Sequence, residues 1–323
     1  NNVLYIDDSK FIELNISSSC ECQKYEFKMK QTDQNKFSIF FNNKSYELNE
    51  QPVLACDLGK SLKRGPNQKI VAYSLYGKNP RYYNLLQDLI VKVKEFYPDH
   101  VMRVYHDDTI NKSIICQIEC SNSHVDFCNI HRMPLSLKNS EKVMDLRYVH
   151  AMMWRFLSIG DSFVDLLMSR DIDSQLLQRE VNSVQEWLGS GNIGHIMRDN
   201  PAHKTYILGG MWSFRVEKAR VLGKLIYEKM VDKNISSKFN FNGKNPKGFD
   251  QIFLSKHVYK MIENNSTIHD SYLCEKYPKS KPWPTQRNGN CFVGRVGRCN
   301  ETSTFKSCPK KCRPENHLDW EAC

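Results

Sequence analysis

A regular alternation of apolar strand patterns and helical patterns, which begins at Lys69, constrains the fold of this chain most strongly. Residues 70–76 are typical of a buried strand, residues 82–96 carry helical spacing, and residues 101–105 are typical of a second strand. A strand, a helix and a second strand in this order form a crossover unit with two parallel strands. The pattern therefore predicts an α/β fold, with a mainly parallel sheet that carries helices on both faces.

The same alternation continues towards the C-terminus. The sequence predicts a further strand at residues 163–168 and helices at residues 141–157, 180–188 and 216–230. Residues 114–139 contain cysteines and are expected to form an insertion between the second strand and the next helix. Most of the chain therefore belongs to one Rossmann-like arrangement.

The two ends of the chain do not follow this pattern. Residues 1–60 alternate short apolar and polar stretches between Asn-rich turns, which predicts an N-terminal extension of β-hairpins. The last fifty residues hold six cysteines and little periodicity, so we expect residues 296–323 to form a disulfide-rich tail packed on the main domain. Residues 61–295 are then expected to form the central α/β domain, which would hold the functional site.

Cysteines and glycosylation sequons indicate an oxidising compartment. The twelve cysteines are an even number that allows complete pairing. We expect a protein of the secretory pathway lumen, in the Golgi or ER, or a secreted protein. The sequence holds no apolar run long enough to span a membrane and no signal peptide, so membrane attachment would need a segment outside it, as in a type II membrane protein. Asparagine-linked acceptor sequons begin at Asn15, Asn43, Asn111, Asn234, Asn264, Asn265 and Asn300.

The charge pattern and the cysteine spacing argue against two further classes of site, for nucleic acid and for zinc. The net charge of +10 suits an acidic partner, but the basic residues are spread along the chain, and the densest cluster, residues 60–64, has no interleaved aromatic side chains. We therefore expect no nucleic-acid binding. Five cysteines and histidines have spacings that superficially suit a zinc site, but these spacings depart from the common zinc-finger patterns. An oxidising lumen favours disulfides between such thiols. The residues concerned are Cys116, Cys120, His124, Cys128 and His131.

An acidic pair follows the strand expected at residues 163–168. In extended backbone, side chains two residues apart point the same way, so Asp171 and Asp173 would face one hard cation. The structural alternative is an acidic turn that closes a strand. Tyr76 and Asp107 also follow predicted strands, and ligands of such sheets bind beyond the carboxyl ends of the strands. We therefore expect these side chains to converge on one crevice.

Several motifs together resemble GT-A glycosyltransferases, in which an Asp-x-Asp element at a strand end holds manganese. The chain looks most like a largely uncharacterised bacterial and invertebrate family of that fold, over roughly residues 69–295. One departure is Asn200-Pro201, where relatives carry His-Pro after the Met-Arg-Asp element, with His203 slightly later. The stretches that carry the resemblance are residues 163–174, Arg179-Glu180, Trp187, residues 195–199 and residues 207–212.

The resemblance implies a GT-A fold and a bound Mn²⁺ or Mg²⁺, held by Asp171 and Asp173, that bridges the phosphates of a nucleotide sugar. Such folds often take a third metal ligand from their C-terminal part, where His269 is the candidate and a surface histidine is the alternative. Asp250 begins an apolar helix and is the implied general base, which would remove the proton of the acceptor hydroxyl. If the transfer retains configuration, Gln251 is the implied residue beside the anomeric carbon. A plain helix cap is the alternative for Asp250.

Other residues are expected to contact the donor or the acceptor. Lys281-Pro282-Trp283 resembles the arrangement of glycogenin-like enzymes, in which the lysine meets the diphosphate. The structural alternatives are a surface turn for Lys281, an ion pair with Glu180 for Arg170, and a core position for Trp212. The donor contacts are Tyr76, Asp107, Arg147, Arg170 and Lys281, and the acceptor contacts are Gly209, Gly210 and Trp212.

The sequence thus predicts a metal-dependent glycosyltransferase. The donor is a nucleotide sugar, expected to be a UDP-sugar, and the acceptor is a hydroxyl of a glycan, glycoprotein or glycolipid. The alternative is a noncatalytic, lectin-like protein that keeps the fold, since such a module would also be glycosylated, rich in cysteine and lined with aromatic side chains. A phosphoesterase would need a denser cluster of carboxylates and histidines to hold two ions.

Overall fold

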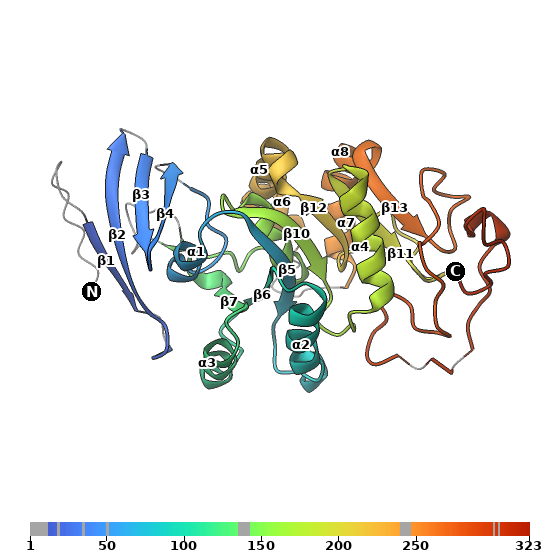
Figure 1. Ribbon diagram of the computed structural model, residues 1–323, viewed down its shortest axis with the longest axis horizontal. Helices are drawn as coiled ribbons and strands as arrows, with labels where there is room; N and C mark the ends of the chain where they lie inside the picture. Colours follow the sequence, from blue (N-terminus) through green and yellow to red (C-terminus); the bar gives the residue numbers. More distant parts are fainter. Residues whose placement is uncertain are drawn as a thin grey trace.

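The structure is a computed structural model, elongated along one axis. The N-terminal strands lie at one end, an α/β unit occupies the middle and the C-terminal tail lies at the other end (Figure 1). The residues described are 12–17, 20–33, 36–49, 52–134, 143–239, 247–299, 301–302 and 304–323.

A seven-stranded mixed sheet forms the centre of the molecule, in the order β13-β11-β12-β10-β5-β6-β7. β12 runs antiparallel to β10 and β11, and every other neighbouring pair in the sheet is parallel. The predicted α/β class with a mainly parallel sheet is confirmed. The strands are β5 (Gln68–Leu75), β6 (His100–His106), β7 (Val125–Asn129), β10 (Val164–Arg170), β11 (Gly194–Arg198), β12 (Met211–Arg215) and β13 (Ser266–Asp270).

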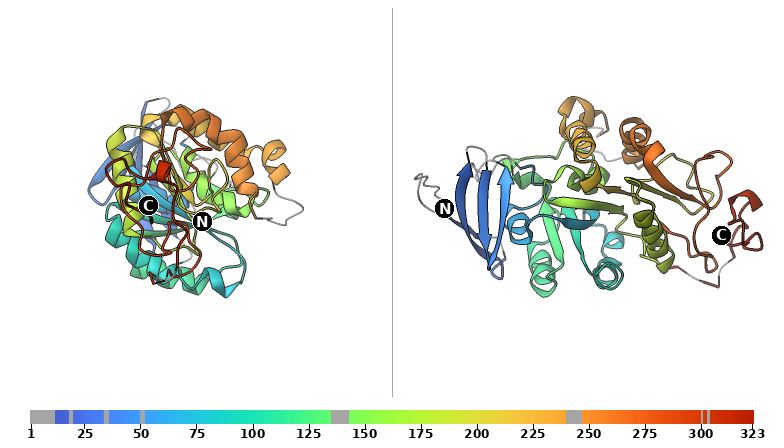
Figure 2. Two further views of the ribbon diagram at one scale, coloured as in Figure 1. Left: turned by 90° about the vertical axis from the view of Figure 1, so that its right-hand side faces the viewer. Right: turned by 45° about the horizontal axis from the view of Figure 1, so that its top comes forward.

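Helices cover both faces of this sheet (Figures 1 and 2). Side chains of β5 alternate between two cores: Ile70 packs with the helices of one face, and Val71 packs with those of the other. The first face is covered by the 3-10 helix η3 (Ala151–Gly160), α5 (Arg220–Val231) and α7 (Phe249–Leu254). The second is covered by α2 (Leu86–Phe96), α3 (Lys112–Ser121) and α4 (Gln178–Ser190). Shorter helices are α1 (Leu58–Arg64), α6 (Lys233–Ser236) and α8 (Lys260–Ile262).

Two sequence predictions were wrong in the middle of the chain. The expected insertion at residues 114–139 instead supplies α3 and the edge strand β7, which pairs with β6. The expected helix at residues 141–157 is in part outside the described residues. Its remainder contains the short strand β9 (Val143–Met144), paired with β8 (Met133–Pro134), and then η3. η3 is buried on nearly every side, so it shows no amphipathic period.

The N-terminal strands form a separate four-stranded antiparallel sheet, which confirms the predicted β-hairpin extension. Its core includes Phe27, Phe37 and Ile39, and Phe163 of the central unit packs into it. The strands are β1 (Ile12–Ser17), β2 (Lys24–Asp33), β3 (Lys36–Phe41) and β4 (Lys44–Asn49).

Six disulfides pair all twelve cysteines, so the zinc alternative is excluded for these thiols. Two of them attach the segment after β1 to α3, and three lie in the C-terminal part, where a disulfide-rich tail was expected. Complete pairing fits a secreted or lumenal protein. Within the described ranges, no helix has the length and apolar character needed to cross a membrane. The pairs are Cys20–Cys116, Cys22–Cys120, Cys56–Cys128, Cys274–Cys312, Cys291–Cys299 and Cys308–Cys323.

A buried ion pair joins α1 to the edge of the central sheet and makes stability depend on pH. Arg64 donates to both oxygens of the fully buried Asp126, over 2.6 Å from Nε and 2.7 Å from Nη2. Burial by itself would raise the pKa of Asp126, but the Arg64 guanidinium beside it prevails and lowers that pKa to about 2.

We predict that this pair stabilises the fold above about pH 4 and that its contribution disappears as pH falls towards 2, because the carboxylate is protonated more readily in the unfolded chain. The contribution is about 2 kcal/mol in the free energy of unfolding. Urea unfolding of wild type and Asp126→Asn at pH 6 and pH 2.5 measures it. The difference between the two proteins should shrink at the lower pH, and an equal difference at both values would contradict the prediction.

Candidate functional site

The strand order reverses between β5 and β10, and a cavity opens beside that point. β6 and β7 extend the sheet on one side of β5, while β10 lies on the other. In open α/β sheets ligands bind at such a reversal, beyond the carboxyl ends of the strands. A cavity of about 290 Å³ lies there and is lined by Tyr76 after β5 and by Asp171 and Asp173 after β10. Gly209, Gly210, Asp250 and Gln251 also line it.

The acidic pair occupies a turn rather than an extension of β10. The amide of Ser174 donates to the carbonyl oxygen of Asp171 over 3.2 Å, so the expected extended geometry was wrong, although both carboxylates still line one cavity. The Asp173 carboxylate accepts no hydrogen bond from another side chain in the part of the chain that the structure describes. Burial, and then the charge of Asp171, raise the pKa of Asp173 above its usual range. A bound cation would favour the ionised form of Asp173 and so oppose both causes of the raised pKa.

Arg155 of η3 joins the acidic turn to α7, and sequence reasoning did not assign it to the site. Its Nη1 donates to Asp171 Oδ1 over 2.5 Å and its Nη2 donates to Asp250 Oδ2 over 3.0 Å. The side chain is only 6% exposed, which strengthens both pairs relative to surface ion pairs. The one available signal was a charged residue inside the apolar stretch 151–159.

Asp250 lies in the first turn of α7 and has one oxygen without a protein partner. Oδ2 accepts from Arg155, whereas Oδ1 is buried and unpaired among the described residues. Burial raises the pKa of Asp250, with the Arg155 guanidinium opposing the shift. Gly248, and not Asp250, is the N-cap residue of α7. A fixed carboxylate with a raised pKa has the chemistry of a proton acceptor, and its unpaired Oδ1 lies beneath the surface of the cavity that Asp250 lines.

Two consecutive glycines let these carboxylates approach the backbone. A Cβ at Gly209 would collide with Asp250 Oδ2, and a Cβ at Gly210 would collide with Asp171 Oδ2. The Ser169 hydroxyl donates to the carbonyl oxygen of Gly209 over 2.7 Å and fixes the loop. The glycines therefore shape the acidic end of the cavity, and their contact with an acceptor sugar stays a prediction.

We predict that Gly210→Ala displaces the Asp171 carboxylate and destabilises the protein by about 1 to 3 kcal/mol, because an added Cβ overpacks this contact. Gly189→Ala is the matched control, since its added Cβ meets no atom within 4 Å and alanine favours the interior of α4. Melting temperatures of the two variants test this. A Gly210→Ala protein as stable as the control would contradict it.

His269 and Lys281 lie away from the acidic pair, so the structure does not bring the expected third metal ligand to it. His269 on β13 is buried. Its Nδ1 lies 2.9 Å from His195 Nε2 and its Nε2 lies 2.9 Å from Glu186 Oε2. Lys281 pairs with the same glutamate. The register of β13 turns His269 towards α4, and neither residue lines the cavity.

Four other expected contacts are also placed elsewhere. Arg170 is buried in an ion pair with Glu180, as the structural alternative proposed. The exposed Arg147 pairs with Asp145, and Asp107 lines a different cavity, of about 350 Å³. Trp212 is completely buried and packs edge-on against Phe156, so its ring cannot stack on a sugar.

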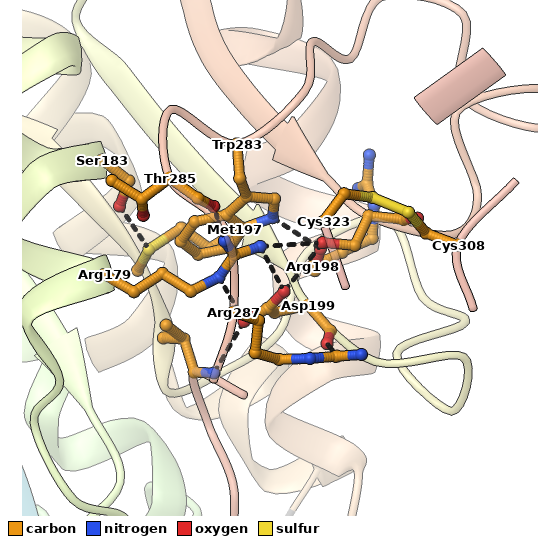
Figure 3. Close-up of polar contacts among 12 residues, drawn as sticks. Arg179, Ser183, Met197, Arg198, Asp199, Trp283, Thr285, Arg287, Cys308 and Cys323 are labelled. Carbon is orange, nitrogen blue, oxygen red and sulfur yellow. Dashed lines mark hydrogen bonds and ion pairs between the residues drawn. A yellow bond between two sulfur atoms is a disulfide. The ribbon is translucent and has the colours of Figure 1, made fainter. Parts of the chain in front are cut away.

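The Met-Arg-Asp element braces the C-terminal tail rather than facing the cavity. Asp199 is fully buried and accepts hydrogen bonds from Arg179 (Figure 3). It also accepts from Ser271 and from the amide of Val293. The neighbouring Arg198 pairs with Asp270 over 2.5 Å. These contacts tie the ends of β11 and β13 to α4. Arg287 adds the tail, because its Nη1 donates to the carbonyl oxygen of Asp199 over 3.0 Å and its amide donates to that of Ala322 over 2.7 Å. Together they fix the loop between β11 and β12 that borders the cavity.

The cavity suits a metal ion only together with a bound anion. Among the residues described, no group of three or more His, Cys, Asp or Glu side chains is arranged to hold a metal by itself. A magnesium-type ion needs only one or two carboxylates when substrate phosphates complete its coordination. Asp173, together with the oxygen of Asp171 that Arg155 does not bind, would meet that need. No protein-family model matches this chain, and a search of curated proteins finds no relative.

Proposed function

We propose that this protein is a metal-dependent glycosyltransferase that moves a sugar from a nucleotide sugar, a UDP-sugar in the first instance, to a hydroxyl of a glycan, glycoprotein or glycolipid. The observation that carries the proposal is that Asp173 and Asp250 line one cavity at the strand reversal. Among the described residues, the Asp173 carboxylate accepts no hydrogen bond from another side chain, and Asp250 Oδ1 has no hydrogen-bond partner. The seven-stranded mixed sheet is compatible with the GT-A resemblance.

The charges that line the cavity support an anionic substrate with a cation. Among the described residues that line it, three carboxylates share the cavity with two cations, Arg155 and the exposed Lys247, so the ionised lining carries a net negative charge. Arg81, outside the lining, offsets the charge of Asp173 in part. A diphosphate alone would be repelled. A bound Mn²⁺ or Mg²⁺, held by Asp173 and Asp171, would reverse that charge and stabilise the departing diphosphate.

The side chains divide the transfer step between them. Asp250 Oδ1 removes the proton of the acceptor hydroxyl while the oxygen of that hydroxyl forms a bond to the anomeric carbon. The bond from that carbon to the diphosphate oxygen breaks, and the nucleoside diphosphate leaves with the electron pair. Arg155 holds Asp250 and Asp171 in place throughout, since it binds both. If configuration is retained, Gln251 is the group that borders the anomeric carbon.

A panel of nucleotide sugars tests the proposal. With manganese, one UDP-sugar should raise the melting temperature, because a ligand at about 100 times its Kd stabilises the folded state by about 2.7 kcal/mol. The same donor should be hydrolysed slowly to UDP. No stabilisation and no hydrolysis with any nucleotide sugar would overturn the assignment.

A noncatalytic glycan-binding protein is the second candidate, and one observation favours it. Arg155 already engages both Asp171 and Asp250, as expected of a site whose acidic groups serve structure. Glycan-array binding without nucleotide binding or hydrolysis would select this candidate. For the glycosyltransferase we propose residence in the lumen of the Golgi or ER. All six sequon asparagines that the structure describes are exposed, which supports passage through the secretory pathway. They are Asn15, Asn43, Asn111, Asn234, Asn264 and Asn265.

A further inference from the structure

His203 lines the cavity from the loop between β11 and β12, and its ring is fixed. The amide of Asp199 donates to His203 Nδ1 over 3.0 Å. The ring also packs edge-on against Phe292, with 5.6 Å between ring centroids. Since the Asp199 carboxylate is itself held by Arg179 and Ser271, the donor that fixes the imidazole cannot easily turn away.

The direction of that hydrogen bond determines where the imidazole carries its proton. A backbone amide can only donate, so Nδ1 must present a lone pair, and the hydrogen of the neutral ring is on Nε2. Nε2 has no partner among the described residues and is not one of the buried unpaired atoms, so it is open to the cavity. With a hydrogen in that position, His203 neither binds a cation nor accepts a proton there.

The surroundings of His203 keep it neutral and place it near the acidic turn. Burial lowers the pKa of His203 to about 4, although the carboxylates of Asp199, Asp171 and Asp270 oppose the shift and Arg198 supports it. His203 and Asp171 line the same cavity, where the proposed function places a diphosphate.

We propose that His203 is a neutral hydrogen-bond donor of this site, and that Nε2–H binds a phosphate oxygen of a nucleoside diphosphate held beside Asp171 and Asp173. The identity of the ligand rests on the proposed function, whereas the tautomer rests on the Asp199 contact alone. His203 thus selects for a hydrogen-bond acceptor at the position where the metal-bound group lies.

Two amide variants separate the two nitrogens of the ring. Asparagine places an oxygen near the position of Nδ1, so His203→Asn keeps the bond from Asp199 and removes the donor. Glutamine places its amide nitrogen near Nε2, so His203→Gln keeps the donor and leaves the Asp199 amide unpaired. In calorimetric titrations of UDP with MnCl₂, His203→Asn should lose at least about tenfold in affinity, and His203→Gln should stay within about threefold of wild type. The melting temperature should fall more for His203→Gln.

Uridine with MnCl₂ distinguishes the phosphate from the nucleoside. Uridine affinity should be equal in wild type and His203→Asn, and an equal loss for uridine and UDP would overturn the phosphate contact. Unchanged UDP affinity in His203→Asn would overturn it too.

Long-range proton–nitrogen correlation spectra of ¹⁵N-histidine protein read the tautomer without any ligand, with His203→Gln identifying the signal. Protonated Nε2 and bare Nδ1 are expected, and the opposite tautomer would overturn the proposal. If wild type binds no UDP, the proposed function and the phosphate contact fail together, while the spectrum still decides the tautomer.

Discussion

Replacing Asp173 with asparagine will reduce manganese-dependent hydrolysis of the best UDP-sugar by more than about a hundredfold without loss of stability. A neutral amide is a poor ligand for a hard cation. The change removes the carboxylate of the acidic turn that forms no ion pair within the described ranges. The pKa of Asp173 is raised in the folded protein, so its ionised form opposes folding at neutral pH. The melting temperature of Asp173→Asn should therefore equal or exceed that of wild type.

Asp107→Asn is the matched control for this experiment. Asp107 also follows a strand of the central sheet, but it lines the other cavity and accepts from Thr109. Initial rates across a manganese titration should be close to wild type for this control. Equal losses in both variants, or full activity in Asp173→Asn, would show that the acidic turn does not hold the metal.

Replacing Asp250 with asparagine is expected to lower kcat for transfer by about 10² to 10⁴ while the affinity for UDP with manganese stays within a few-fold of wild type, because the amide cannot take the acceptor's proton. The base must be ionised to act. Since its pKa is raised, wild-type activity should fall with decreasing pH before an ordinary carboxyl group would be protonated, and Asp250→Asn should lack this limb of the profile.

Gln251→Ala decides between the two stereochemical routes. A larger loss in Gln251→Ala than in Asp250→Asn, together with retained configuration at the anomeric carbon of the product, would contradict the assignment of Asp250 as base. The anomeric proton signal of the product measures configuration directly.

The parts of the fold that the sequence predicted are those with strong local periodicity. β5, α2 and β6 each bury a pattern that is visible within a dozen residues. α4 contains the helix expected at residues 180–188 and ends at Gly191, which lies in the left-handed region. β7 was missed because its second residue, Asp126, is charged and is accommodated in the core by its ion pair with Arg64, which lies 62 residues earlier in the chain. Local patterns carry no information on such partners.

The same limit explains which site residues were found. Asp171, Asp173 and Tyr76 follow buried strands, and topology alone takes them to the cavity. Arg155 acquires its role from partners 16 and 95 residues away, so only the structure reveals it.

The sequence prediction was wrong for two further site candidates, His269 and Trp212, because their directions depend on strand register. A shift of one residue turns a strand side chain to the opposite face, so the direction of His269 and Trp212 depends on how β13 and β12 pair with their neighbours. Their sequence neighbours do not encode that pairing.

The most direct measurement is an anomalous difference map, at the manganese absorption edge, of crystals grown with UDP and MnCl₂. One strong peak next to the Asp173 carboxylate, in contact with diphosphate oxygens and absent from crystals of Asp173→Asn, is the expected result. UDP bound with no peak at that carboxylate, or with manganese held at another place, would contradict the account.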